Sequence, residues 1–112
     1  MAATLKQLAH SAITAAAGAT TLYTAPALTR TLLTKASVHN QGTVAATFDV
    51  HIVPSGGTAN ADNRLLSACP IAAGDTLMLD EVKGVMLAAA GFVVVRSYTA
   101  TLNYLLNGTE LT

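Results

Sequence analysis

Charged residues are scarce in this chain. Lys, Arg, Asp and Glu make up 11% of its 112 residues, whereas about a quarter of an average globular domain is charged. Six basic residues balance six acidic ones, so the formal net charge is zero. Because a nucleic-acid-binding domain normally carries a basic patch and this sequence has no run of Lys and Arg, we expect no nucleic-acid partner. With 52% hydrophobic residues, the composition also excludes intrinsic disorder.

Cysteines, aromatic residues and long apolar runs are rare as well. The single cysteine, Cys69, can form neither an internal disulfide nor a multi-cysteine metal site. No stretch reaches 18 consecutive apolar residues, so we expect no membrane span. Residues Met1–Lys6 show no basic region followed by an apolar one, so we expect no signal peptide. Two Phe, three Tyr and no Trp argue against an aromatic stacking platform for sugars or single-stranded nucleic acid.

Threonine and β-branched residues are frequent instead, and turn-forming residues recur roughly every ten positions. This pattern predicts an all-β fold, a single jelly-roll-like antiparallel β-sandwich of about eight strands. The length fits one domain, with residues 21–112 as the sandwich and residues 1–20 as an N-terminal strand or arm. The predicted strands are Thr20–Thr24, Leu28–Val38, Thr43–Val53, Thr76–Leu79, Phe92–Tyr98 and Ala100–Leu106. Three further segments stay open: Leu5–Ile13 is a strand or short helix, Arg64–Ala68 is a brief strand or turn, and Val85–Ala90 is a helix or strand.

The clearest strand is Thr43–Val53, in which apolar residues alternate with others. Successive side chains of a strand point to opposite faces. We therefore expect the even positions, such as Phe48 and Val50, to face the core. The odd positions, which include Asp49 and His51, are expected to face solvent.

The preceding strand, Leu28–Val38, is predicted to pair with Thr43–Val53 as a hairpin across the turn His39–Gly42. One face of it is expected to carry Leu32, Ala36 and Val38. Further turns are predicted at Pro54–Gly57, Ala73–Asp75 and Asn107–Gly108.

The residue types that bind metals are present but spread along the chain. A zinc site needs three or four converging ligands, and the histidines His10, His39 and His51 could form one with Cys69 only if the fold brought them together. We expect His51 to be a solvent-face residue instead. The segment Asn60, Asp62 and Asn63 resembles part of a calcium loop but lacks a terminal Glu and enough carboxylates. We therefore predict no metal site.

Catalytic groups are not predicted either. Cys69 as a nucleophile would need a His partner and a lowered thiol pKa, but its neighbours Leu66–Pro70 are largely apolar, so a structural cysteine is expected. Pro54–Gly57 has no following Lys and is not a phosphate loop, and Tyr98 and Tyr104 are expected to anchor the core or an interface. We predict no enzyme, no cofactor and no catalytic residue. The acidic residues show no paired-carboxylate spacing: Asp49, Asp62, Asp75, Asp80 and Glu81.

Five segments of the chain together resemble a known family, the small virion structural proteins of tailed bacteriophages, which include cement, decoration and tail-associated β-sandwich proteins. The likeness spans roughly residues 20–95 and consists of turns and strands rather than catalytic motifs. The residues that carry it are Leu22–Pro26, Val38–Gly42, Ala45–Phe48, Val50–Gly57 and Ile71–Leu77.

The resemblance implies a β-sandwich component repeated on a phage particle, assembled in the host cytoplasm. We expect a cement or decoration subunit that stabilises the head, associates with copies of itself as a trimer, and contacts the major capsid protein. A tail, baseplate or fibre component that contacts tail proteins is the alternative within this class, and a receptor- or glycan-binding module is the alternative from another class. The near-neutral, charge-poor surface independently favours a subunit partly covered by neighbours.

Overall fold

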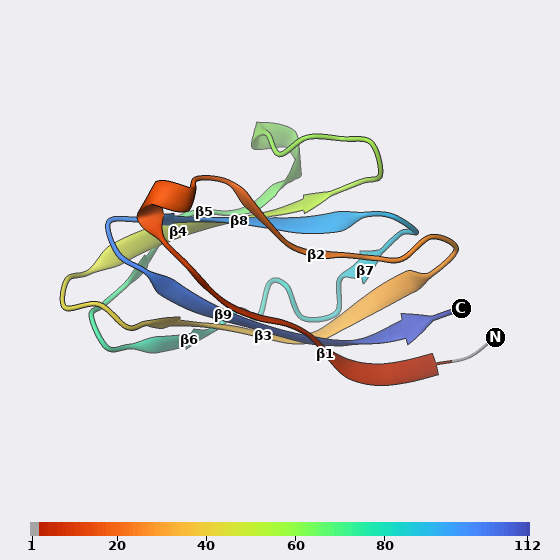
Figure 1. The fold of residues 1–112 in the computed structure, drawn as a ribbon, viewed down its shortest axis with the longest axis horizontal. Coiled ribbons are helices and arrows are strands. Elements are labelled where there is room, and N and C mark those ends of the chain that lie inside the picture. Colours follow the sequence, from red (N-terminus) through yellow and green to blue (C-terminus); the bar gives the residue numbers. More distant parts are fainter. Residues whose placement is uncertain (1–2) are drawn as a thin grey trace.

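The computed structural model describes residues 3–112, and Met1 and Ala2 lie outside the described part. The chain forms two antiparallel sheets that face each other, with both termini at the same end (Figure 1). The strands are β1 (Ala3–Ile13), β2 (Thr20–Thr24), β3 (Arg30–Asn40), β4 (Ala46–Val53), β5 (Arg64–Ile71), β6 (Thr76–Met78), β7 (Met86–Leu87), β8 (Phe92–Tyr98) and β9 (Leu102–Leu111), and two short 3-10 helices are η1 (Ala15–Ala17) and η2 (Ala61–Asn63).

The strand order identifies a jelly roll. The first sheet has the order β1-β9-β3-β6, with β7 also paired to β3, and the second has the order β2-β8-β4-β5. Strands from the first half of the chain therefore pair with strands from the second half: β1 with β9, β2 with β8, β3 with β6 and β4 with β5. This arrangement is the double Greek key of jelly rolls. It confirms the prediction of an all-β, jelly-roll-like sandwich. Within residues 3–112, no helix is long and apolar enough to cross a membrane.

The predicted hairpin of residues 28–38 with residues 43–53 is wrong, because β3 and β4 lie in opposite sheets. The corner between them is built around the buried side chain of Asn40. Its Nδ2 donates to the Val44 carbonyl at 2.8 Å, and its Oδ1 accepts from the Gly42 backbone N–H at 2.9 Å. These bonds let the chain leave one sheet and enter the other within a few residues.

The core lies between the two sheets. Phe48 of β4 and Tyr104 of β9 meet there edge to face, with ring centroids 6.3 Å apart, and the Tyr104 hydroxyl bonds the Ser97 hydroxyl at 2.9 Å. Tyr104 is thus a core anchor, as predicted. The even positions of the predicted strand 43–53 supply Ala46, Phe48 and Val50 to this core, whereas Val44 precedes β4 and is exposed.

Two β-bulges flank β9 at the same level. Leu8 is the extra residue of β1, opposite Leu106–Asn107, and Thr34 is the extra residue of β3, opposite Asn107–Gly108. The predicted turn at Asn107–Gly108 is therefore wrong, because β9 continues through it to Leu111. The β3 bulge also shifts the alternation: Leu33 is fully buried, and Leu32 points to the opposite face. The predicted face of Leu32 with Ala36 and Val38 is wrong at Leu32 for this reason.

The N-terminal segment is part of the same sandwich. Leu5–Ile13, which were predicted as a strand or a short helix, lie in the edge strand β1, which begins at Ala3 and is paired along its length with β9. Residues 15–17 form η1 and lead into β2. Residues 1 and 2 of the predicted N-terminal strand or arm lie outside the described residues.

Candidate functional site

Asp49 is buried on the outer side of the second sheet rather than exposed as predicted. Its carboxylate accepts from the Ala68 backbone N–H at 2.6 Å and from the Tyr98 hydroxyl at 2.9 Å. Two residues of β5, Ser67 and Ala68, oppose Asp49 in a bulge, and Ala68 there has a φ of 47°. The hydrogen bond that Tyr98 donates to Asp49 raises the pKa of Tyr98. The Arg96 guanidinium lies 4.9 Å from the Tyr98 ring centroid. This cluster joins three strands and is structural.

His51 is also buried, because residues 54–63 fold over it. Its Nδ1 lies 3.2 Å from the Asn60 carbonyl and 3.1 Å from Asn63 Oδ1. Both partners are acceptors, so Nδ1 carries the proton and donates. Asn60 and Asn63, considered above as calcium ligands, instead cap η2 through the backbone N–H groups of Asp62 and Asn60. The prediction of a solvent-facing His51 is wrong because the loop that covers it leaves no periodic signal in the sequence.

A third polar cluster closes the sandwich at the end that holds both termini, and sequence reasoning missed it. Lys6 Nζ lies 3.2 Å from Glu110 Oε1, and the Tyr23 hydroxyl donates to Glu110 Oε2 at 2.5 Å. The same hydroxyl lies 2.9 Å from Thr31 Oγ1. The cluster therefore ties β2 of one sheet to β1, β3 and β9 of the other. Its members are up to 104 positions apart, so no local motif could have indicated it.

The contacts of this cluster change the pKa values of Tyr23 and Glu110. The hydrogen bond from Tyr23 lowers the pKa of Glu110, and Lys6 lowers it further. Burial, followed by the bond to Glu110, raises the pKa of Tyr23 to about 12. Burial likewise raises the pKa of Tyr104 to about 12.

We expect the folded protein to resist tyrosine ionisation in alkali. A raised folded-state pKa contributes stability below the unfolded value of 10.0, and that contribution is lost as the pH rises towards about 12. In a titration followed by tyrosinate absorbance, native protein should ionise at higher pH than urea-unfolded protein, with unfolding between pH 10 and pH 12. Superimposable titration curves for native and unfolded protein would contradict this expectation.

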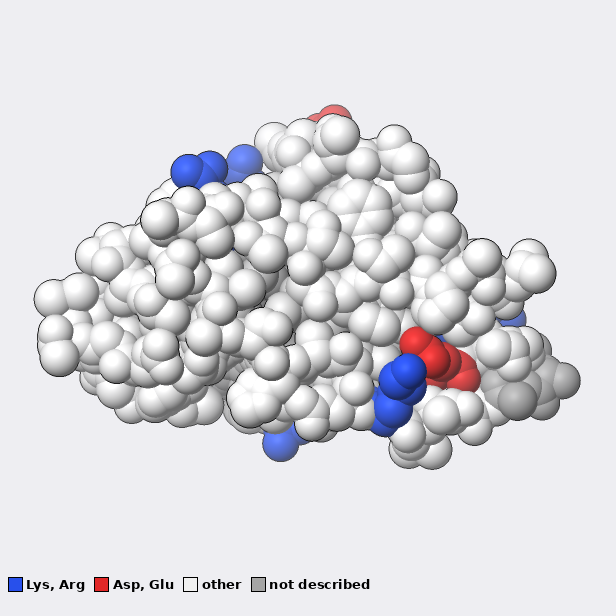
Figure 2. Space-filling view, viewed as in Figure 1, with Lys and Arg blue, Asp and Glu red and all other residues white. Residues whose placement is uncertain are grey.

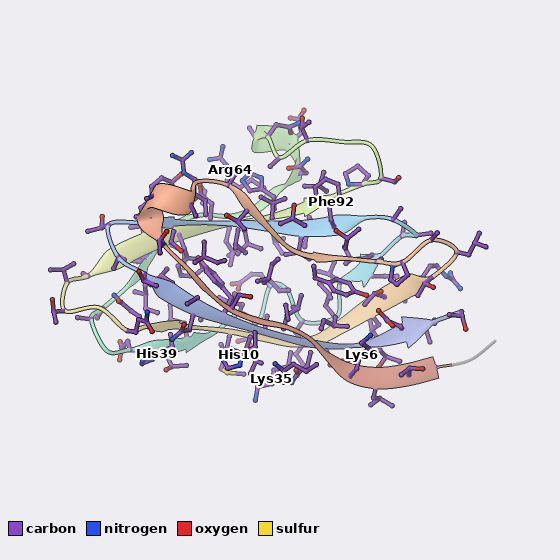
Figure 3. The ribbon with its side chains drawn as sticks, in the orientation of Figure 1. Lys6, His10, Lys35, His39, Arg64 and Phe92 are labelled. Carbon is purple, nitrogen blue, oxygen red and sulfur yellow. The ribbon has the colours of Figure 1, made fainter. Side chains whose placement is uncertain are left out.

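The fold does not bring the candidate metal ligands and nucleophile together. His10 on β1 and His39 on β3 lie on the side of the first sheet that faces away from the second (Figure 3), whereas His51 is on the second sheet. Cys69 packs against the core, and burial, with a smaller effect of Glu81, raises its thiol pKa. Among residues 3–112, no three His, Cys, Asp or Glu residues are placed to hold a metal ion.

The outward side of the first sheet, here called the β1-sheet face, is uncovered and poor in charge. Cross-strand pairing sets its residues in rows. One row runs Leu5, Thr109, Leu32 and Met86, and another runs His10, Leu105, Ser37 and Met78. Leu5, Met78 and Met86 are 82%, 54% and 46% exposed. The other residues of this face are Ala3, Gln7, Ala12, Arg30, Lys35, His39, Thr76, Asn103, Asn107 and Leu111.

Most of the surface seen from the side of the sandwich is uncharged (Figure 2). The three polar clusters hold strands and a loop in place, so the β1-sheet face is the surface best suited to contact a partner. The chain matches no family model, no curated protein and no solved structure.

Proposed function

We propose that the protein is a structural subunit of a tailed-bacteriophage particle that binds the head as a cement or decoration protein. The observation that carries the proposal is the broad, uncovered and nearly uncharged β1-sheet face on a jelly-roll sandwich. Jelly rolls are common among viral capsid domains, although lectins and cupins share them. Many copies of such a face could each bind weakly and still hold a head together through multivalency.

The segments that resemble phage structural proteins have a structural role in this fold, which agrees with the proposed function. Pro54–Gly57 closes β4 through the bond from Gly57 N–H to the Pro54 carbonyl at 2.9 Å, with Gly56 at a φ of 78°. Asp75 N–H similarly bonds the Ala72 carbonyl at 3.1 Å in the turn before β6. These motifs set the ends of strands, which is the role that the resemblance implies.

The proposed function is tested by the composition of purified particles. Quantitative mass spectrometry of particles of the phage that encodes the chain should find it in a copy number that matches the head lattice. Heads assembled without the chain should break at a lower temperature. A few copies per particle would instead indicate the alternative, a tail, baseplate or fibre component. Absence from the particle would overturn both.

We further propose that the subunits associate as a trimer, since closed symmetry hides charge-poor surface. Light scattering after size-exclusion chromatography should then give about three times the chain mass of 11.4 kDa. A clean monomer would contradict a preformed trimer.

A further inference from the structure

A loop of the chain covers the outer face of the second sheet, whereas the outer face of the first sheet is uncovered. On the second sheet, His51, Val53 and Val94 are at most 8% exposed although they point away from the core, and residues 54–63 lie over this side of the sandwich (Figure 1). On the first sheet, no described segment lies over the β1-sheet face (Figure 1). The chain thus covers one face with its own loop and leaves the other for a partner.

The charges of the β1-sheet face have one sign. Arg30 and Lys35 are basic, and none of the six acidic residues belongs to the face. Asp49 is on the other sheet, and Glu110 is turned towards Lys6 and Tyr23. The remaining acidic residues occupy loops and the short helix η2: Asp62, Asp75, Asp80 and Glu81.

A groove of about 210 Å³ borders the face beside Lys35 and Met78. Lys83 and Asp80 also line it, so two ammonium groups outnumber one carboxylate. A partner carboxylate entering this groove would lie near both lysines.

We propose that the β1-sheet face docks onto an acidic protein surface of the head, an inference that rests on the proposed function. Complementary charge orients the contact, while the leucines and the adaptable methionines supply buried apolar area. Like charges disfavour a second copy of the same face as its occupant, and two strong cations are too few for nucleic acid.

The face is large enough for a specific contact. Three strands of 10 or 11 residues, β1, β9 and β3, are bordered by the short strands β6 and β7, of 3 and 2 residues. With strands about 4.8 Å apart and roughly 3.4 Å per residue, they span on the order of 600 Å². Buried against an equal partner area, this gives about 1,200 Å², which is the lower limit of standard protein interfaces. A contact of that size is weak alone and suited to many-fold repetition.

The test uses the full chain and DNA-free heads assembled without it, with bound protein measured by co-sedimentation. Lys35→Glu and Leu5→Asp should each weaken binding about tenfold, and Lys35→Arg should bind like the wild type. The matched controls are Arg64→Glu, on the second sheet, and Val44→Asp, at the β3–β4 corner; they should change binding less than about twofold. The four residues that these five variants change are all exposed, and circular dichroism confirms that each variant is folded. High salt should weaken binding without releasing the protein, because most of the contact is apolar.

The outcomes separate this inference from the proposed function. If the wild type binds and the face variants bind equally well, docking occurs elsewhere and the inference fails while the function stands. If the face variants lose the trimer rather than head binding, the occupant is a second copy and the inference also fails. Release by added DNA would assign the basic residues to nucleic acid, which overturns the acidic protein partner. If the wild type does not bind heads, the cement function fails and the inference falls with it.

Discussion

Replacement of Gly108 by alanine should destabilise the protein by about 3 kcal/mol. A Cβ at this position would lie 2.5 Å from the Leu32 carbonyl oxygen and 2.8 Å from Leu8 Cδ1. The first contact is with backbone of the neighbouring strand, which cannot move without breaking the pairing of β3 with β9. Gly→Ala in an ordinary strand would stabilise by roughly 0.5–1 kcal/mol, so the sign of the change is diagnostic.

Urea denaturation of the variant measures this effect as a lower midpoint at unchanged slope. The control is Thr109→Ala, one residue along β9 on the opposite face, which should stay within about 0.5 kcal/mol of the wild type. A Gly108→Ala variant as stable as the wild type would show that the paired bulges of β1 and β3 do not constrain β9.

The strands themselves were predictable because half-buried strands leave a period of two in the sequence. Thr20–Thr24 and Phe92–Tyr98 have the predicted bounds, and in β9 Leu102, Tyr104 and Leu106 all face the core. Alternation reports only which side of a strand is apolar. It carries no information about which strand lies beside it, so the neighbouring strands β3 and β4 were wrongly paired.

The bulges and buried polar clusters could not be predicted for a related reason. The bulge at Thr34 reverses the face of every later residue in β3, yet no residue type marks it. Asn107–Gly108 is a strong turn dipeptide locally. Tertiary packing overrides it, because β9 continues between β1 and β3 and position 108 lies too close to the Leu32 carbonyl for any side chain. Asp49 was predicted to face solvent because it lies on the polar side of the alternating pattern. In the structure, the β5 bulge places the Ala68 N–H against its carboxylate, and nothing in the sequence marks that bulge.

The β1-sheet face was foreseen only as a property of composition. The scarcity of charged residues and the net charge of zero indicated a partly covered surface somewhere, but the face exists only through the register of five strands from both halves of the chain. Leu5 and Leu32 are 27 positions apart in sequence, yet both pair with Thr109. Which apolar residues gather on one side is therefore set by the jelly-roll topology.

Asp49→Ala should cost about 3 kcal/mol of stability, because it removes two charge-assisted hydrogen bonds and leaves the Ala68 N–H without its partner. The bulge at Ala68 has a positive φ of 47°, a conformation that costs about 1–2 kcal/mol in an alanine, and the bond to Asp49 offsets this cost.

Tyr98→Phe, which removes one of the two bonds from a half-buried side chain, should cost only about 1 kcal/mol. Asp49→Asn keeps an acceptor for Ala68 and should fall between the two. Thermal unfolding of the three variants would show this order if Asp49 stabilises the β5 bulge. Equal losses for Asp49→Ala and Tyr98→Phe would mean that only the tyrosine bond matters and that the bulge is held by the sheet alone.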